Sequence, residues 1–318
     1  MKKFKIGILG ASSIATRKFI PAIQKTPNIK IDFIASRNLS KAKKLSKLYK
    51  CKYGNYNDLF NNSKNLDIVY ISTPPNKRLH YFKKSIEKKL NIFSEKPAFI
   101  DYSSAKKIIS LCNKNKVFFF ECWMFKYHPQ HDAVKQLIKS NTIGKINFFE
   151  SKFFYPEPAS SNIRLNKNLK GGVLYDSIGY PINALDILFG LRNFSNNFYF
   201  INHKKYKVDK LVNIQLKSKE IIANLSCGFG FNYESYYKIY GSKGIIKVDK
   251  PFSINENFSN KIKVYKDDKI KYIKIKSYNQ FSLMISNFLN IMNEHRFVNK
   301  NNNFNLKYIK LFTKIFKI

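Results

Sequence analysis

The sequence predicts an α/β protein: an N-terminal doubly wound parallel Rossmann sheet, then a C-terminal α+β domain with a wide, mostly antiparallel open sheet. Up to residue 121, short apolar runs alternate with stretches of helical spacing, which is the pattern of βαβ units. After residue 195, strand-like runs follow one another through tight polar connections such as KDDK and GSKG, which is the pattern of antiparallel hairpins. We therefore expect two domains, 1–121 and 122–318.

The first domain contains five expected strands, and helices connect them. Each strand is a nearly continuous apolar run, as expected where parallel strands are buried on both faces. The strands are KFKIGILG, IKIDFIAS, LDIVYIST, NIFSEKP and KVFFFEC. The helices are ASSIATRKFIPAIQKT, LSKAKKLSKLYK, LHYFKKSIEKKL and SSAKKIISLCNKN.

The second domain begins with helices over 129–140 and 173–190 and continues as strands. The expected strands are NNFYFINH, KLVNIQLKSK, IIANLSCGFG, YYKIYGS, GIIKVDK, KIKVYKD and KYIKIKS. A final helix, FNLKYIKLFTKIF, is expected to close the chain. One wide sheet with helices on one face satisfies this order of elements. The other face would be uncovered and apolar, which predicts a homodimer through the sheet.

The composition indicates a globular protein with an unusual charge. Of 318 residues, 44% are hydrophobic and 16% aromatic, which is enough to form a core. There are 58 Lys and Arg against 20 Asp and Glu, a formal net charge of +38. The lysines are spread along the whole chain, and few of the cations are Arg, the residue favoured for bidentate base contacts. The abundance of Lys, Asn, Ile, Phe and Tyr together is typical of an AT-rich genome.

We interpret the charge as solvated surface. The positive charge raises direct nucleic-acid binding as an alternative, but we expect no nucleic-acid partner. The positive electrostatic field of the protein would favour the binding of anionic small molecules. No apolar run approaches the length of a membrane span, and the basic start lacks an apolar signal region, so we expect a cytoplasmic protein and no membrane partner. The cysteines show neither CxxC spacing nor a His/Cys cluster, so we expect no metal; they are Cys51, Cys112, Cys122 and Cys227.

A glycine turn between the first strand and the first helix predicts a dinucleotide site. Gly10 allows the tight turn, Ser12 stands where the middle glycine of the usual motif would be, and Ala15 fills the last, close-packed position. Backbone amides at the helix start, including those of Ser13 and Ile14, would hold the pyrophosphate. The alternative is a βα turn that binds no ligand.

Two further strand ends extend this site. Ser36 and Arg37 follow the second strand, where an acid usually contacts the ribose of NAD, whereas a cation suits the 2′-phosphate of NADP. We therefore predict NADP as the cofactor, with NAD as the alternative. Arg37 could instead be a solvated surface residue that contacts no cofactor. Thr73, Pro74 and Asn76 follow the third strand at the carboxyl edge, where ligands bind in open α/β sheets. Taken alone, this loop could be a simple turn.

Two short stretches carry candidate catalytic residues. Glu95 and Lys96 end the fourth strand and are candidate cofactor contacts, and the proline after them favours an extended backbone that would direct Lys96, also a candidate catalytic residue, to the cofactor crevice. Taken alone, this stretch could be a surface turn. Asp176 and Tyr180 stand four residues apart in GGVLYDSIGY, so a continuous helix would place them on one face. We expect both to face a crevice and the two glycines to let the chain pass close to ligand. A structural hydrogen-bonded pair is the alternative.

The chain resembles the Gfo/Idh/MocA oxidoreductases, relatives of glucose–fructose oxidoreductase and inositol dehydrogenase. The stretches that carry the resemblance are, in order, GILGASSIA, ASR, STPPN, EKP and GGVLYDSIGY. The resemblance spans essentially the whole chain, including YKIYGSKGIIKV. CWMFKYHPQ and the tyrosine at 180 resemble the branch with dimeric dihydrodiol dehydrogenase and NADP-dependent xylose dehydrogenase. Many other members have His where Tyr180 stands.

The resemblance implies hydride transfer between the nicotinamide and a carbinol or carbonyl carbon of a sugar, cyclitol or nucleotide sugar. Lys96 matches the lysine of the EKP motif, Asp176 the acid and Tyr180 the acid/base residue. A free phenol has a pKa of about 10 and is a poor base near neutral pH, and a neighbouring ammonium group such as that of Lys96 favours its ionised form. Asp176 would orient the substrate hydroxyl or Lys96.

Three residues are weaker candidates for substrate contact: Trp123, Lys126 and Arg164. A rim or packing role is the alternative for each. A non-catalytic NADP-binding sensor or regulator of the same fold is the alternative function, and the presence of Lys96, Asp176 and Tyr180 together argues against it.

Overall fold

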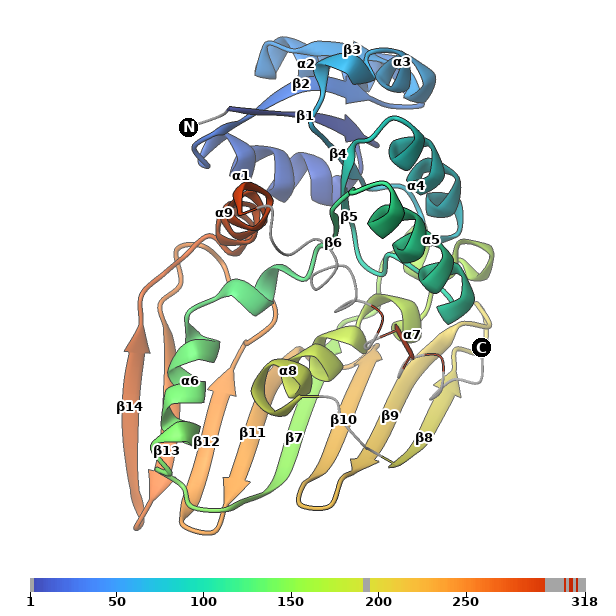
Figure 1. Ribbon diagram of the computed structural model, residues 1–318. Coiled ribbons are helices and arrows are strands. Elements are labelled where there is room, and N and C mark those ends of the chain that lie inside the picture. The colour runs from blue at the N-terminus through green and yellow to red at the C-terminus, as the bar shows by residue number, and fades with distance from the viewer. Residues whose placement is uncertain (1–2, 191–194, 295–305, 307–308, 311–312, 314–318) are drawn as a thin grey trace. The chain divides into compact units, whose positions relative to one another are not determined.

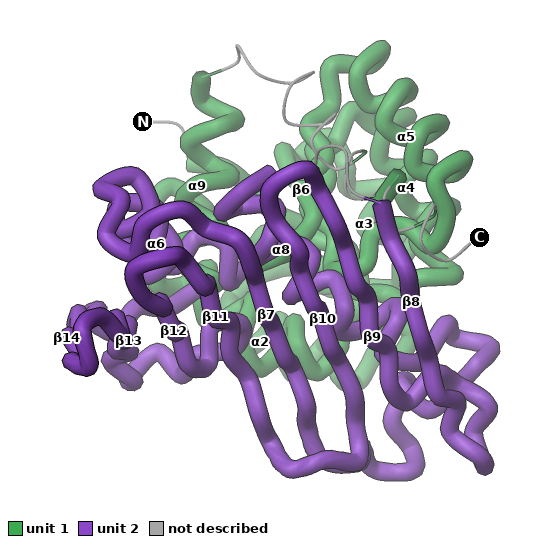
Figure 2. The backbone as a smooth tube through the Cα atoms, turned by 90° about the horizontal axis from the view of Figure 1, so that it is seen from below, with its two compact units in different colours: residues 1–123, 281–313, 318 green, residues 124–280, 314–317 purple. Residues whose placement is uncertain are grey.

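The computed structural model describes residues 3–190, 195–294, 306, 309, 310 and 313. The chain divides into two compact units, coloured separately in Figure 2: residues 1–123 with 281–313 and 318, and residues 124–280 with 314–317. Most of the final helix expected over 304–316 lies outside the described residues.

The first unit is built on a six-stranded parallel sheet with strand order β3-β2-β1-β4-β5-β6, which confirms the predicted doubly wound fold (Figure 1). The strands are β1 (Phe4–Leu9), β2 (Ile29–Ala35), β3 (Lys52–Gly54), β4 (Ile68–Ile71), β5 (Asn91–Ser94) and β6 (Phe119–Glu121). β3, a short edge strand, was not expected from the sequence. The strand order reverses between β1 and β4, and the carboxyl ends of strands at such a switch point form the usual ligand crevice.

Helices of the first unit connect these strands. They are a π-helical turn (Ala15–Phe19) that continues as α1 (Ile20–Gln24), then α2 (Leu39–Tyr49), α3 (Tyr56–Asn61), α4 (Arg78–Glu87) and α5 (Tyr102–Lys114). Side chains cap the first turns of α2 and α5: Asn38 accepts from the amide of Lys41 at 2.9 Å, and Asp101 from that of Ser104 at 2.7 Å. These caps fix where α2 and α5 begin.

The last described helix, α9 (Gln280–Asn293), was not expected and belongs almost wholly to the first unit. Its Phe288 ring stacks 4.6 Å from that of Phe93 and lies 5.1 Å from that of Phe120. These contacts with β5 and β6 explain why Phe281–Thr313 groups with the parallel sheet, whereas the sequence analysis placed all of 122–318 in one domain.

The second unit is built on an eight-stranded sheet with strand order β14-β13-β12-β11-β7-β10-β9-β8. The strands are β7 (Ile146–Tyr155), β8 (Ser195–Asn202), β9 (Asp209–Lys217), β10 (Ile222–Phe229), β11 (Glu234–Gly241), β12 (Gly244–Asp249), β13 (Asn260–Lys266) and β14 (Lys269–Ile275). All neighbours are antiparallel except β7 and β10, which confirms the predicted mostly antiparallel sheet. β7, a central strand, was not expected.

Helices α6 (Gln130–Lys139), α7 (Val173–Asp176) and α8 (Gly179–Phe189) belong to this unit, and α6 and α8 lie across one face of the sheet (Figure 1). Buried aromatic side chains fill that side; for example, the Phe149 ring lies 5.8 Å from those of Phe189 and Tyr237. The core of the second unit therefore sits between these helices and the sheet.

The opposite face of the sheet differs from the apolar surface that we expected. Tyr236 and Tyr240 both donate to Glu150, at 2.5 and 3.0 Å. Asp249 pairs with Lys247 at 2.9 Å and with Lys263 at 3.0 Å. Lysine side chains also lie over the Tyr236 ring, among them Lys152, Lys238 and Lys247. This part of the face is charged and phenolic and not apolar as expected, whereas Phe148 and Phe154, on the same side of β7 as Glu150, are half-buried apolar residues.

Candidate active site

The turn after β1 forms a tight cradle at Gly10. Gly10 has φ +104°, a backbone conformation that favours glycine, and a Cβ there would lie 3.0 Å from Ser72 Oγ. Ser72 Oγ donates to Gly10 O at 2.6 Å. Ser12 Oγ accepts from the amide of Ala15 at 3.2 Å, while Ser13 and Ile14 are exposed at the start of the helix. The turn is thus fixed from within and leaves the helix start accessible, as phosphate binding requires.

Polar groups at the ends of β2 and β4 also fit a dinucleotide. The Thr73 side chain is 5% exposed, and its hydroxyl has no hydrogen-bond partner within the described part of the chain. A buried hydroxyl without a partner costs free energy, so a ligand atom there would satisfy it. Ser36 is buried at the end of β2, and the exposed Arg37 hydrogen-bonds Tyr56. The residues predicted to bind NADP therefore fit that group.

Arg78, which the sequence analysis did not single out, ties together the loops after β4 and β5. It is buried and donates to Thr73 O at 2.8 Å, to Glu95 O at 2.6 Å and, in close contact, to Pro97 O. Burial lowers the pKa of Arg78, whereas the nearby Glu95 and Glu121 carboxylates raise it. This arginine holds the backbone on both sides of Lys96 and at Thr73.

Glu95 and Lys96 play different parts in this loop. The Glu95 carboxylate accepts from Tyr70 OH at 2.8 Å, and burial raises its pKa against the opposing effects of Tyr70, Arg78 and Lys96. Its side chain is thus directed to the interior of the unit. Lys96 precedes a cis peptide bond to Pro97, and its ammonium group lies 5.9 Å from the centre of the Trp123 ring. Trp123 itself is 3% exposed.

In the second unit, Asp176 is the centre of an ionisable cluster. Arg164 Nε lies 2.6 Å from Asp176 Oδ2, and Tyr155 OH donates to the same oxygen at 3.3 Å. The Asp176 carboxylate raises the pKa of Arg164 above its usual range, against a smaller effect of burial, and Tyr155 and Tyr180 add to the rise. Burial raises the pKa of Tyr155, and Asp176 adds to it. Arg164, predicted to contact substrate, therefore contacts the predicted acid.

The helix through this region is broken, contrary to the sequence prediction. α7 ends at Asp176, and α8 begins at Gly179. Ser177 has φ −125° and lies outside the helical region, so Asp176 and Tyr180 are not stacked on one helix face. The i, i+4 prediction was wrong because it assumed a continuous helix.

Tyr180 is more buried than predicted. It is 7% exposed, and its ring lies among three phenylalanine rings at 5.3 to 5.6 Å, those of Phe125, Phe153 and Phe252. Its hydroxyl is 3.9 Å from Met124 Sδ. An apolar, tightly packed surround fixes the ring, so only the phenol oxygen has the chemistry to act.

Lys126 contacts the first turn of α8. Its ammonium group donates to Asn183 Oδ1 at 3.0 Å, and Asn183 Nδ2 donates to Gly179 O at 2.8 Å. These bonds brace the turn that precedes Tyr180. Lys126, another predicted substrate contact, thus supports the tyrosine through Asn183.

The two glycines before α7 allow other parts of the chain to approach closely, and the approach to ligand stays a prediction. A Cβ on Gly171 would lie 2.4 Å from Arg164 O. Gly172 has φ +102°, and a Cβ there would lie 2.2 Å from Asp209 Oδ1. Asp209 Oδ2 accepts from the amide of Leu174 at 2.5 Å. Both glycines are required because Arg164 and Asp209 approach the backbone so closely.

Three residues that the sequence analysis missed therefore support the candidate groups: Arg78, Tyr155 and Asp209. Arg78 was one of few arginines in a lysine-rich chain, which was a usable signal. Tyr155 ends the strand that was not expected. Asp209 lies far along the chain from Asp176, and no periodicity connects the two.

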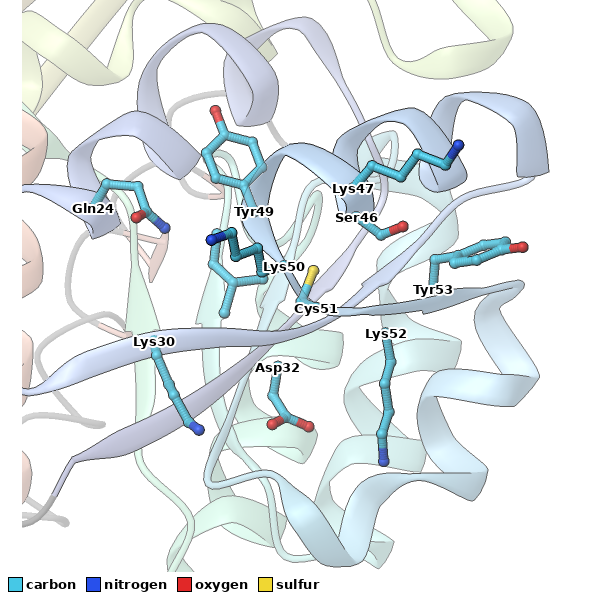
Figure 3. Close-up of a pocket in the computed structure, with 11 residues that line it drawn as sticks. Gln24, Lys30, Asp32, Ser46, Lys47, Tyr49, Lys50, Cys51, Lys52 and Tyr53 are labelled. Atoms are coloured by element: carbon cyan, nitrogen blue, oxygen red, sulfur yellow. The ribbon is translucent and has the colours of Figure 1, made fainter.

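Figure 3 shows a hollow of about 560 Å³ in the first unit, lined by side chains of β2, β3 and the end of α2. It includes Lys30 and Asp32 from the first half of β2, whereas Ser36 and Arg37 follow the carboxyl end of that strand. Burial, with a contribution from Asp32, raises the pKa of the Cys51 thiol in this hollow to about 12, so it is not a nucleophile near neutral pH. We assign this hollow no part in the site.

No group of three or more His, Cys, Asp or Glu side chains among the described residues could hold a metal ion. No helix within the described ranges is both long and apolar enough to cross a membrane.

Comparison with known proteins gives matches over both units. The chain is 28% identical over 260 residues to a dTDP-3,4-didehydro-2,6-dideoxy-alpha-D-glucose 3-reductase of Saccharopolyspora spinosa, covering 79% of this chain and 76% of that protein. It is 26% identical over 187 residues to an NADP-dependent D-xylose 1-dehydrogenase of Haloferax volcanii, covering 58% and 57%. A 3-ketoreductase from Actinomadura kijaniata, solved with NADP and TDP-benzene, superimposes with a TM-score of 0.93 over 99% of this chain and 98% of that one, at 22% identity.

Two family descriptions match the chain itself. Residues 4–121 match an oxidoreductase family with an NAD-binding Rossmann fold, and residues 131–247 match the GFO/IDH/MocA C-terminal domain. These matches confirm the resemblance found in the sequence: the chain belongs to the Gfo/Idh/MocA family of oxidoreductases.

Proposed function

We propose that the protein is an NADPH-dependent reductase, or in the other direction a dehydrogenase, acting on a carbonyl or carbinol carbon of a nucleotide-linked sugar. The spacing of two residues carries the proposal. Structures of two variants of the 3-ketoreductase from Actinomadura kijaniata have been solved, one with a tyrosine replaced and the other with a lysine replaced. The two replaced residues are 84 positions apart in that protein. Lys96 and Tyr180 are also 84 positions apart in this chain.

NADPH, when bound, supplies a hydride from its nicotinamide ring. Tyr180 is the proton donor: its hydroxyl is the polar end of a ring fixed among phenylalanines, and it protonates the substrate oxygen as the carbonyl carbon is reduced. Lys96 supplies positive charge that stabilises developing negative charge on the same oxygen. Because Lys96 is in the first unit and Tyr180 in the second, the proposal requires that both reach one substrate atom.

Asp176 orients a substrate hydroxyl next to the reacting carbon. Arg164 and Tyr155 hold one carboxylate oxygen, at 2.6 and 3.3 Å. Asp176 accepts both of these hydrogen bonds, so in this proposal it acts as a hydrogen-bond acceptor. Trp123 and Lys126 line the approach in this proposal, and Arg164 acts through Asp176.

For the cofactor we propose NADP, bound by Gly10, Ser12, Ser13 and Ile14 at the pyrophosphate and by Ser36 and Arg37 at the 2′-phosphate. Thr73, Pro74, Asn76, Glu95 and Lys96 complete the cradle. The partnerless Thr73 hydroxyl and the exposed Arg37 guanidinium support this assignment. NAD is the alternative.

A homodimer through the sheet of the second unit is part of the proposal. The phenolic face around Tyr236 and Tyr240 supports it, because tyrosine is enriched in interfaces. Light scattering at micromolar concentration should give twice the mass of one chain, and a single-chain mass would refute the dimer. We also propose a cytoplasmic location.

The test of function is oxidation of NADPH with a panel of substrates. dTDP-linked 3-ketosugars, the same sugars without nucleotide, and unrelated ketones should be compared at near-physiological salt. We expect turnover with the nucleotide-linked ketosugars. Turnover only with free aldoses, in the NADP-reducing direction, would show that the substrate is a free sugar and not a nucleotide-linked one. Tight NADPH binding with no turnover on any compound would favour a sensor.

A further inference from the structure

The start of the segment that carries Asp176 is held in place by the carboxylate of Asp209, from a distant part of the chain. α7 spans only Val173–Asp176, too short to be stable by its own hydrogen bonds. Its first turn lacks a side-chain cap from the residue before it, which is Gly172. Asp209, at the start of β9, fills this role: it accepts from the amide of Leu174 at 2.5 Å and also from the backbone of Val173.

We infer that Asp209 is a positioning residue for the reaction, acting through α7 on Asp176 and Arg164; this inference rests on the proposed function. Gly172 connects Asp209 with Arg164 and Asp176. Its amide donates to Arg164 O at 2.8 Å, and its carbonyl accepts from the amide of Asp176 at 3.1 Å. The same residue passes so close to Asp209 Oδ1 that a Cβ would lie 2.2 Å away.

The contacts form a closed loop. Asp209 holds the amides at the start of α7, Asp176 ends that turn, and Arg164 pairs with Asp176 while its carbonyl binds Gly172. A shift of α7 would therefore move the Asp176 carboxylate and the Arg164 guanidinium together. Misplacement of a reacting group by about 1 Å can cost roughly 100-fold in rate.

Each carboxylate oxygen of Asp209 lies against the backbone at the start of α7, which makes the position selective. Oδ2 accepts from Leu174, and Oδ1 faces Gly172. Asparagine would retain one oxygen and place an amide N–H group against the backbone amides, so Asp209→Asn should be a partial loss. Alanine would remove both acceptors. Gly172→Ala would disturb the same contact, because its added Cβ would clash with Asp209 Oδ1.

The control is Asp249→Asn. Asp249 is also a half-buried strand-end acid of the second unit, but its partners are Lys247 and Lys263. Replacing the Asp249 carboxylate should affect the stability of the fold without changing the position of α7.

The experiment has two readouts on the full chain. Hydrogen exchange of the peptide covering residues 164–180 should rise at least tenfold in Asp209→Ala, and less in Asp209→Asn, while Asp249→Asn should match wild type. With the nucleotide-linked ketosugar, kcat should fall roughly 10- to 100-fold in Asp209→Ala. NADPH affinity should be unchanged in every variant, because the predicted cofactor residues belong to the first unit.

The outcomes separate this inference from the proposed function. Unchanged exchange over 164–180 in Asp209→Ala would overturn the positioning role, and so would raised exchange with unchanged kcat. Raised exchange in a protein whose wild type turns over no substrate would confirm that Asp209 orders α7 and would refute the proposed function instead. Equal loss of kcat in Asp249→Asn would show a general stability effect and would also overturn the inference.

Discussion

Arg164 Nε lies 2.6 Å from Asp176 Oδ2, and the two residues come from different segments that the Gly171–Gly172 turn brings together. The pair joins a residue predicted to contact substrate with the predicted acid. Because Arg164 is 39% exposed and Asp176 21% exposed in their side chains, the pair is accessible to a ligand. It is the best-defined polar contact of the candidate site in the second unit.

The first prediction concerns this pair. Arg164→Gln should lower kcat roughly 10- to 100-fold, because the Asp176 carboxylate loses the contact that orients it. Arg164→Lys should recover only part of this, since lysine lacks the planar fork of arginine. Steady-state kinetics of Arg164→Gln, Asp176→Asn and the double variant would measure the coupling. Fully additive losses would show that the two residues act independently.

The second prediction concerns the buried arginine of the first unit. Arg78→Met should lower the free energy of unfolding by about 3 to 5 kcal/mol, because Glu95 and Glu121 lose a buried positive charge. It should also weaken NADPH binding, since Arg78 holds the carbonyls of Thr73 and Glu95. Urea unfolding and cofactor titration measure the two effects. Lys77→Met, an exposed neighbour, is the control, and equal losses in both variants would contradict the role given to Arg78.

Cofactor choice gives the third prediction. Arg37→Ser should weaken NADPH binding by about 1.5 to 3 kcal/mol, the usual contribution of a hydrogen bond to a charged group, and leave NADH binding unchanged. Parallel fluorescence titrations at near-physiological salt measure this. Lys41→Ser removes a nearby exposed charge and serves as the control. If Lys41→Ser weakened NADPH binding equally, the preference would come from the general charge of the protein and not from Arg37.

The fourth prediction is a pH dependence of stability. Burial, with a contribution from Asp176, raises the pKa of the Asp209 carboxyl from 3.8 to about 7, against the backbone amides that lower it. The folded state therefore holds this proton more tightly than the unfolded chain. Its contribution to stability is fully present below pH 3.8 and is lost as the pH rises towards 7. Asp209→Asn removes this titration.

Relative to wild type, the free energy of unfolding of Asp209→Asn should increase by roughly 2 to 3 kcal/mol between pH 5 and pH 8. Urea unfolding at several pH values measures the difference. In Asp249→Asn the difference should be flat over this range, because hydrogen bonds from Lys247 and Lys263 outweigh burial and lower the pKa of Asp249. A flat difference for Asp209→Asn would mean that its carboxyl titrates as in the unfolded chain.

The sequence predicted the elements whose patterns are local. The apolar runs of β1, β2, β4, β5 and β6 and the alternation in β8 to β14 required no knowledge of neighbours. β7 was missed because INFFESKFFY carries aromatic side chains on both faces, with Phe149 buried on one side and Phe154 half-buried on the other. α9 shows a helical pattern of apolar residues, but its position in the first unit depends on Phe288 meeting Phe93.

The candidate residues could be named from the sequence, but their surroundings could not. α7 ends just before the break at Ser177, and it is held by Asp209, which is distant in sequence, and by Arg164. Such contacts follow from the tertiary fold, and a short motif does not encode them. For the same reason, Gly171 and Gly172 could be noted from the sequence, but their close contacts with Arg164 and Asp209 could not be predicted.

The central claim is that Tyr180 and Lys96 assist hydride transfer to a sugar carbon. The most direct measurement uses NADPH deuterated at the nicotinamide C4, mixed with a dTDP-linked 3-ketosugar, and follows deuterium in the sugar by mass spectrometry. Wild type should place one deuterium on the reduced carbon. Tyr180→Phe should bind NADPH normally, and Lys96→Met is measured at saturating NADPH because Lys96 is also a proposed cofactor contact. Both variants should transfer the deuterium at least 100-fold more slowly. Transfer at the wild-type rate in both variants would contradict the account.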